Sequence, residues 1–205
     1  LTADNCSVAS TVNDGPATFP LGTTTVTWTV TDGSGNTATA TQTVTVLDNQ
    51  NPTITAPAAL TVYADANCVA TGVSLGSATT SDNCSGEVAT NDAPGTFQLG
   101  NTTVTWTVTD ASGNTATATQ TVTVSDTTRP TITAPSAVTV NADANCVATS
   151  VSLGTPTTAD NCSVASVTDN GLASYPLGNT TVTWTVTDGS GNTNTATQTV
   201  TVVDN

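Results

Sequence analysis

An internal repeat of 78 residues constrains this chain more than any other feature. The spacing recurs in two series of rare residues: Trp28, Trp106 and Trp184, and Cys6, Cys84 and Cys162. A fixed period of this length is typical of a tandem array, in which each repeat is one small folded element. The period predicts three domains: the C-terminal part of a repeat at 1–48, and complete repeats at 49–126 and 127–205.

Each repeat contains the same predicted β-hairpin. In the middle copy, Val104, Trp106 and Val108 alternate with threonines, and residues 115–124 alternate in the same way. Period-two alternation indicates a strand with one buried and one wet face. Residues 110–114, between the two limbs, are turn-formers. The tryptophan is therefore predicted to anchor the core.

The rest of the middle repeat is predicted to contain further short strands. Alternating apolar residues indicate strands near 52–55, 60–62, 69–75 and 84–90, whereas the small polar residues of 76–83 indicate a loop. About seven short strands without a helical period are typical of an immunoglobulin-like sandwich. The predicted fold is all-β, with tandem immunoglobulin-like β-sandwich repeats of about 78 residues.

Composition excludes several classes of function. The chain has 205 residues, one basic side chain (Arg129), fifteen acidic ones and no His, for a net charge of −14. We therefore expect neither an enzyme nor a nucleic-acid-binding protein, because general bases are usually His and polyanions need a basic face. The single Glu87 leaves no carboxylate pair placed for glycoside hydrolysis. No apolar run approaches the ~20 residues that would insert this fragment into a membrane.

The cysteine spacing predicts a disulfide within each complete repeat. Cys68 pairs with Cys84, and Cys146 with Cys162, each pair sixteen residues apart; such a loop is stabilised by roughly 3 kcal/mol. Cys6 occupies the second position of a pair, so we expect its partner upstream of this fragment. A zinc site, which lacks His, and free buried thiols are the alternatives. Disulfides predict an extracellular, cell-surface location.

Four motifs resemble those of the hyalin repeat, or HYR domain. They are Pro-x-Ile-x-x-Pro at 52–57 and 130–135, Asp-Asn-Cys-Ser at 82–85 and 160–163, Phe-x-Leu-Gly-x-Thr-Thr-Val at 97–104, and Val-Thr-Asp-x-Ser-Gly-Asn-Thr at 108–115. The resemblance implies an immunoglobulin-like module of extracellular adhesion proteins. Long, nearly identical arrays of this kind resemble surface adhesins of Bacteroidota, including gliding-motility adhesins exported by type IX secretion. The family often has cysteines where this chain has Ala56 and Ala118, so the disulfide pairing rests on the spacing alone.

The short linkers 48–52 and 126–130 predict a semi-rigid array. We expect a stalk or filament shaft that holds a distal binding region away from the cell. Its expected partners are neighbouring repeats of the same chain, other copies in a fibre, and surface glycans bound through a region outside this fragment. A carbohydrate- or ligand-binding array is the alternative, with Tyr63 as its best-placed aromatic residue. Ice binding by the regularly spaced threonines is a third hypothesis.

A more specific hypothesis is a calcium site at each junction, and calcium is the only cofactor that the sequence suggests. Linker Asp48 is predicted to meet Asp110 and Asn114 in the next hairpin turn, and Asp126 to meet Asp188 and Asn192. Carboxylate and amide oxygens are the ligands that calcium prefers. The alternative is that these residues only form turns and strand ends, for which the same residue types are selected.

Overall fold

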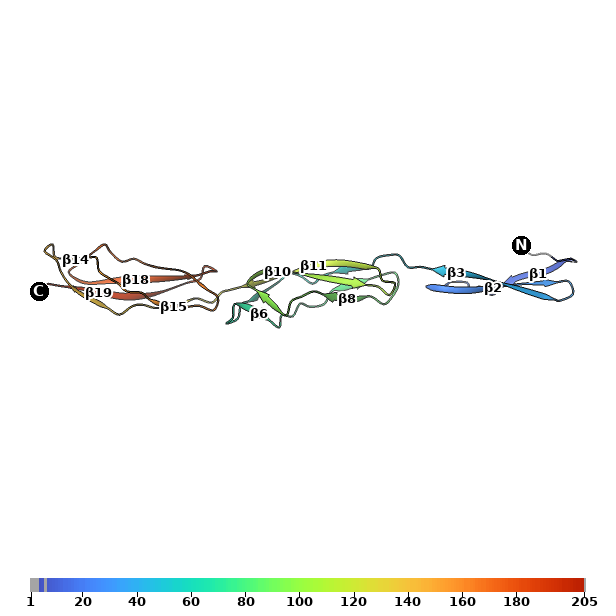
Figure 1. The fold of residues 1–205 in the computed structure, drawn as a ribbon, viewed down its shortest axis with the longest axis horizontal. Helices are drawn as coiled ribbons and strands as arrows, with labels where there is room; N and C mark the ends of the chain where they lie inside the picture. The colour runs from blue at the N-terminus through green and yellow to red at the C-terminus, as the bar shows by residue number, and fades with distance from the viewer. Residues whose placement is uncertain (1–3, 6, 205) are drawn as a thin grey trace. The chain divides into compact units, whose positions relative to one another are not determined.

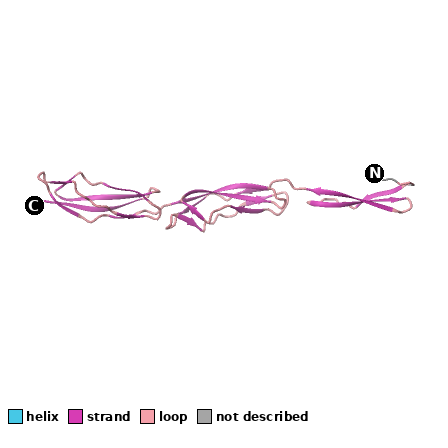
Figure 2. Ribbon diagram, in the orientation of Figure 1, coloured by secondary structure: helices cyan, strands magenta, loops and turns pink. Residues whose placement is uncertain are grey.

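The computed structural model describes residues 4–5 and 7–204. These residues form strands and irregular segments only (Figure 2), which confirms the all-β prediction. Within the described part there is accordingly no helix long and apolar enough to cross a membrane. The chain divides into two compact units. The first holds residues up to Thr55 with 78–90 and 107–118, and the second holds 56–77, 91–106 and the residues from Thr119 onward.

The last repeat lies within the second unit and shows the arrangement most completely (Figure 1). Its strands are β12 (Thr131–Thr133), β13 (Val138–Asn141), β14 (Val147–Thr149), β15 (Thr157–Ala159), β16 (Val164–Asp169), β17 (Ser174–Pro176), β18 (Gly178–Asp188) and β19 (Thr193–Val203). A four-stranded sheet has the order β13-β19-β18-β16, and two ladders, β12-β15 and β14-β17, complete the repeat. Strands β12 and β17 lie against β18 and β19. The repeat is therefore a small β-sandwich.

The middle repeat contains the same eight strands. They are β4 (Thr53–Thr55), β5 (Leu60–Tyr63), β6 (Val69–Thr71), β7 (Thr79–Ser81), β8 (Val88–Asn91), β9 (Thr96–Gln98), β10 (Gly100–Thr109) and β11 (Thr115–Ser125). The sheet order is β5-β11-β10-β8, with ladders β4-β7 and β6-β9. The predicted loop at 76–83 was wrong because β7 lies there, paired with β4. The predicted strand over 69–75 ends at Thr71.

The described part of the first repeat is a single three-stranded sheet in the first unit. Its strands are β1 (Val8–Asn13), β2 (Gly22–Asp32) and β3 (Thr37–Val46), in the order β1-β2-β3. The described residues provide no second layer over it. Consequently Trp28 is 39% exposed, whereas Trp184 of the last repeat is 6% exposed.

The hairpin tryptophans of the two complete repeats, Trp106 and Trp184, occupy the core, as the alternation predicts. In the last repeat, Trp184 packs in one cluster with Tyr175, Val182, Val200 and Val202, all of them buried. The buried apolar positions of β18 are Val, Trp and Val, those of β19 are Val200 and Val202, and the threonines between them are exposed or half-buried. Each complete repeat is thus closed by β-branched side chains around two large aromatic residues, a tryptophan and a Phe or Tyr.

A buried glutamine links the tryptophan to the other side of the sandwich. The indole N–H of Trp184 donates to Gln198 Oε1 at 3.0 Å. Gln198 Nε2 in turn donates to the carbonyl oxygens of Ser136 and Leu153, both at 2.8 Å. Gln198 is 2% exposed. All three hydrogen bonds of the side-chain amide are therefore satisfied by groups that lie far apart in the sequence.

We predict that Gln198→Leu destabilises the last repeat by roughly 2–4 kcal/mol, because an indole N–H and two carbonyl groups lose their partner in a buried site. The matched control is Gln42→Leu. Gln42 accepts the same bond from Trp28 at 2.9 Å, but at an exposed position. Urea unfolding followed by tryptophan fluorescence measures both variants. Equal losses of stability would contradict the role given to the buried carbonyl groups.

Candidate junction site

The first component of the site is the tight loop between β5 and β6. Asp65 Oδ1 accepts the N–H groups of Asn67 at 2.8 Å and Val69 at 3.3 Å. The Cys68 N–H donates to the Asp65 carbonyl at 3.1 Å. An aspartate that bonds to the backbone just after it is a typical turn former. The loop holds Cys68 at a positive φ of 62° and presents its side chain at the end of the repeat.

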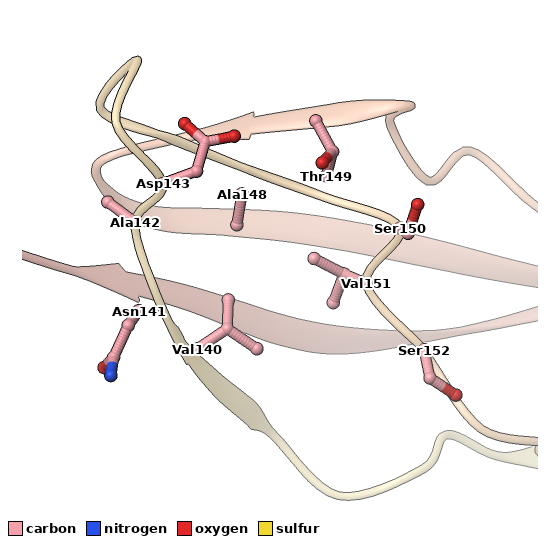
Figure 3. Close-up of a pocket in the computed structure, with 9 residues that line it drawn as sticks. All are labelled: Val140, Asn141, Ala142, Asp143, Ala148, Thr149, Ser150, Val151 and Ser152. Atoms are coloured by element: carbon pink, nitrogen blue, oxygen red, sulfur yellow. The ribbon is translucent and has the colours of Figure 1, made fainter.

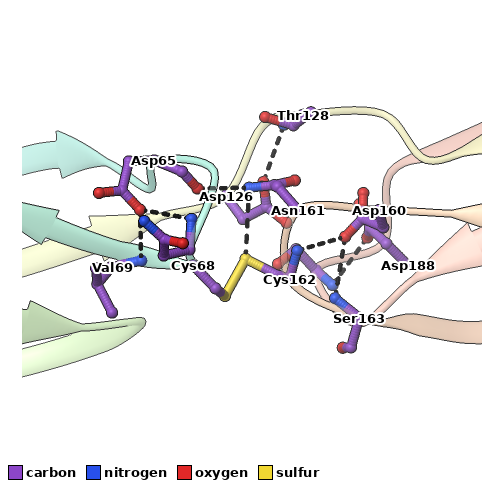
Figure 4. The surroundings of a disulfide bond; sticks show 12 residues. Asp65, Cys68, Val69, Asp126, Thr128, Asp160, Asn161, Cys162, Ser163 and Asp188 are labelled. Atoms are coloured by element: carbon purple, nitrogen blue, oxygen red, sulfur yellow. Dashed lines mark hydrogen bonds between the residues drawn. A yellow bond between two sulfur atoms is a disulfide. The ribbon is translucent and has the colours of Figure 1, made fainter.

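The second component is the Asp160-Asn161-Cys162-Ser163 loop of the following repeat. Asp160 Oδ2 accepts the N–H groups of Cys162 at 2.9 Å and Ser163 at 3.0 Å. Asn161 Nδ2 donates to the Asp65 carbonyl at 3.1 Å and to Asp126 Oδ1 at 3.3 Å. Asn161 thus connects the preceding repeat, the linker and its own loop (Figure 4).

A disulfide bond joins these two loops across the junction. Cys68 is bonded to Cys162, with their Cα atoms 4.7 Å apart and a sequence separation of 94 (Figure 4). Cys84 and Cys146 are free. The predicted pairs Cys68–Cys84 and Cys146–Cys162 were therefore wrong. The predicted upstream pairing of Cys6 concerns a residue outside the described part of the chain.

The length of the sandwich explains why cysteines of one repeat do not pair. In the last repeat, the loop of Cys146 lies beside the end of β19, because the Ala142 N–H donates to the Val203 carbonyl. The loop of Cys162 lies beside the start of β19, because Val164 pairs with Asp188. β19 has eleven residues, which corresponds to more than ~30 Å at about 3.4 Å per residue. Disulfide formation needs Cα atoms within about 7 Å.

The linker and the hairpin turn complete the site. One side-chain oxygen of each of Asp126, Asp160 and Asp188 lies within 4.8 Å of the others. The structure therefore brings Asp126 and Asp188 together, as the sequence predicted, and adds Asp160. Asn192 acts as a donor there: its Nδ2 lies 3.3 Å from the Asp126 carbonyl and 2.8 Å from Asp188 Oδ2. Sequence reasoning assigned the Asp-Asn-Cys-Ser motif to the disulfide alone and missed Asp160 and Asn161.

An equivalent cluster lies at the other junction, within the first unit. Asp48, Asp82 and Cys84 each place a ligand atom within 4.8 Å of the others. Asn114 Nδ2 donates to the Asp48 carbonyl at 3.3 Å and to Asp110 Oδ2 at 2.8 Å. The Asp48 carboxylate beside the Cys84 thiol, its burial and further nearby carboxylates raise the pKa of Cys84. The thiol therefore stays protonated and weakly reactive at neutral pH.

The turn aspartates are ionised at neutral pH despite their burial. Asp188 is 2% exposed, and burial on its own would raise its pKa. Hydrogen bonds from the side chain and backbone of Asn192 and from the Ser190 N–H outweigh that effect, so the pKa of Asp188 lies below its ordinary value. The pKa of Asp110 is lowered by the same arrangement around Asn114. The junctions are therefore strongly negative.

A surface hollow lies near the opposite end of the last repeat (Figure 3). It is lined by residues 140–143 and 148–152. Among these residues only Asp143 is titratable, and its Oδ1 accepts the Asn145 N–H at 2.8 Å. The lining offers no nucleophile paired with a base. Its counterparts one period earlier include Asp65, whose carbonyl oxygen receives Asn161 at the junction.

The chain belongs to the HYR domain family. The family model matches residues 2–46, 47–124 and 125–202, which together span nearly the whole chain. This result confirms the resemblance carried by the four motifs. No curated protein matches the chain. The family and its all-β tandem repeats fit an extracellular, adhesion-type repeat array.

Solved structures of similar fold include tandem cadherin domains. Protocadherin Gamma B2 extracellular cadherin domains 3–6 align at 16% identity and a TM-score of 0.43, covering 89% of this chain and 60% of that one. Drosophila N-cadherin EC1-4 aligns at 12% identity and a TM-score of 0.42, covering 90% of this chain and 59% of that one. Mouse Cadherin-23 EC22-24 aligns at 16% identity and a TM-score of 0.41, covering 88% of this chain and 74% of that one. This chain thus spans about 60% of the first two proteins.

Cleavage at the single glutamate tests the disulfide directly. Glu87 separates a fragment with Cys6, Cys68 and Cys84 from one with Cys146 and Cys162. After thiol alkylation, denaturation and Glu-specific proteolysis without reductant, we predict that the two fragments stay covalently linked. Mass spectrometry of the monomeric product reads the result, and Cys68→Ala is the control that must separate. Separation of the wild-type fragments would instead support pairing within each repeat.

We predict that Cys68→Ala lowers stability by roughly 3–4 kcal/mol, since the lost bond closes a long loop. Cys146→Ala is a matched control. Cys146 has nearly the same backbone, with φ of 59° against 62°, in an equivalent loop, but it is unpaired and exposed. We expect its effect to stay within about 0.5 kcal/mol. Denaturant unfolding under non-reducing conditions compares the two. A Cys146→Ala loss as large as that of Cys68→Ala would show that the loop, and not the disulfide, causes the change.

Proposed function

We propose that this chain forms part of the shaft of a secreted cell-surface adhesin or filament. In this shaft, consecutive HYR repeats are locked together by disulfide bonds. The observation that carries the proposal is the Cys68–Cys162 bond between neighbouring repeats. A disulfide of this kind persists in the oxidising conditions outside the cell.

Two connections restrict a pair of domains more than one does. The peptide linker at Asp126 would act as a hinge if it were the only connection. The disulfide between Cys68 and Cys162 supplies a second covalent connection, and the hydrogen bond from Asn161 to the Asp65 carbonyl supplies a third, non-covalent contact. Bending at the junction would stretch at least one of them. This arrangement suits a shaft that transmits force and keeps a distal binding region at a distance.

The free cysteines occupy the positions that would form the same disulfide at the neighbouring junctions. Cys146 is exposed, at the position that Cys68 occupies one period earlier. It would receive the second cysteine of a following repeat. Cys84, the counterpart of Cys162, would receive the first cysteine of a preceding repeat. Each junction of a longer array would then carry one disulfide.

The surface and the family support this role. The net charge of −14 makes neighbouring shafts repel one another and limits aggregation. The likeness of the motifs to long arrays in Bacteroidota surface adhesins supports a gliding or surface adhesin exported by type IX secretion. Glycan recognition belongs to a region outside this fragment. No catalytic role is proposed, because the junction aspartates are engaged in turn and loop hydrogen bonds.

The alternative of a carbohydrate-binding array has less support. Trp106 and Trp184 are 5% and 6% exposed, so neither can stack on a sugar ring. Tyr63 is 67% exposed, but its counterpart in the next repeat is Asn141. A binding surface repeated along the array would need the same aromatic residue in each repeat.

Small-angle X-ray scattering in the presence of chelator tests the shaft. We predict an extended profile for the oxidised chain and a clearly more flexible one for Cys68→Ala. Cys146→Ala should scatter like the wild type. A compact wild-type particle, or identical flexibility in the wild type and Cys68→Ala, would overturn the proposal that the disulfide stiffens an extended array.

A further inference from the structure

The junction between the last two repeats contains buried oxygen atoms that lack hydrogen-bond partners. Asp126 is only 7% exposed. Its Oδ1 accepts the Thr128 N–H at 3.0 Å and Asn161 Nδ2 at 3.3 Å, whereas its Oδ2 is buried and accepts nothing. A buried acceptor without a partner costs about 1–3 kcal/mol, and more when it is charged. The linker carboxylate thus has one buried oxygen that receives no hydrogen bond.

Two more such oxygens belong to the adjoining loop. Asp160 Oδ1 and Asn161 Oδ1 are also buried without a hydrogen-bond partner. The other atom of each side chain is engaged: Asp160 Oδ2 with its own loop, and Asn161 Nδ2 with Asp65 and Asp126. Hydrogen bonding therefore fixes both side chains and leaves one oxygen of each unused (Figure 4).

Among the residues that the structure describes, no basic side chain is paired with the cluster. Carboxylate oxygens of Asp126, Asp160 and Asp188 gather within 4.8 Å. The chain has no Lys or His, and its single Arg129 is exposed. The Asn192 N–H donates to Asp188 Oδ1 and Asn192 Nδ2 donates to Asp188 Oδ2, both at 2.8 Å, so the Asp188 carboxylate is held in place beside the other two. Burying several like charges is strongly unfavourable unless a cation compensates them.

We infer that this cluster binds a calcium ion, with Asp126, Asp160, Asp188 and Asn161 as its protein ligands. Each of these residues offers an oxygen atom as its ligand atom, which is the ligand type of hard divalent cations. Calcium accepts crowded, irregular sets of six to eight oxygens, whereas magnesium needs a near-ideal octahedron and retains water. Cys162 is engaged in the disulfide and cannot supply the thiolate that would favour zinc.

The other junction repeats the arrangement. Asp48 Oδ2 is also buried without a partner, and Asn83 Nδ2 reaches Asp48 Oδ1 at 3.4 Å, as Asn161 reaches Asp126. The third ligand atom of this cluster, however, is the free Cys84 thiol, and Asp48 and Asp82 are only half-buried. The calcium assignment is therefore made for the Asp126 junction alone.

Isothermal titration calorimetry of the full chain with calcium chloride tests this assignment. The titration is made in about 0.15 M NaCl, which screens diffuse binding. We expect one calcium ion to bind per chain, at the Asp126 junction. Asp126→Asn and Asp160→Asn preserve shape but remove one charge each, and each should abolish this binding or weaken it at least tenfold. Asp143→Asn, an exposed carboxylate outside both clusters, is the matched control and should bind as the wild type does.

Circular dichroism of the chelated proteins confirms that the variants are folded, and a calcium-induced rise in melting temperature gives a second measurement. That rise should be reduced in Asp126→Asn and Asp160→Asn and unchanged in Asp143→Asn. Wild-type-like binding by both cluster variants, absence of saturable binding, or equally tight binding of magnesium would overturn the calcium assignment. The fragments produced at Glu87 would remain linked in all these cases, so the calcium proposal can be refuted without refuting the proposal of a disulfide-linked shaft.

Discussion

The buried hydrogen bond between tryptophan and glutamine holds each sandwich together. Aromatic residues make up only 3% of the chain, so each complete repeat depends on one indole ring for much of its core. A buried indole N–H needs an acceptor. Gln198 supplies it and uses its two amide hydrogens on the carbonyls of Ser136 and Leu153, which lie in irregular segments. The long hairpin and the short strands facing it are thereby joined by one side chain, and Gln120 repeats the arrangement in the middle repeat.

The length of that hairpin determines which groups lie at the two ends of a repeat, where they can bond to a neighbouring repeat. Strands β18 and β19 run the full length of the repeat, so the turn at Asp188 and the loop at Asp143 lie at opposite ends. The outermost groups at these ends are complementary. One end offers a backbone carbonyl and a cysteine, as at Asp65 and Cys68, and the other offers an amide donor and a cysteine, as at Asn161 and Cys162. A fold with complementary ends forms an array by simple repetition.

The sequence predicted the strands better than it predicted their connections. Alternation located β10 and β11 and the inward tryptophans, because a period of two survives in any sheet with one wet face. It missed β7, whose residues are small and polar and whose pairing with β4 depends on a distant partner. The prediction of the disulfide pairs failed for a different reason. Cys84 and Cys162 occupy the same position in successive repeats, so the sequence cannot tell whether Cys68 pairs with Cys84 in its own repeat or with Cys162 in the next one.

The acidic site was predicted in part, because the sequence does not show which loops face the junction. Asp126 and Asp188 were paired correctly because a linker and the next turn are brought together by any end-to-end arrangement. Asp160 and Asn161 could not be added without knowing that their loop faces the junction, which the Cys68–Cys162 bond fixes. The disulfide and the acidic cluster therefore act on different parts of one junction. The disulfide limits how far the repeats can separate, whereas a cation among Asp126, Asp160 and Asp188 would fix the linker on the repeat that follows it. The two constraints would add to each other, because the disulfide restricts the outer edge of the junction and a cation would restrict the linker itself.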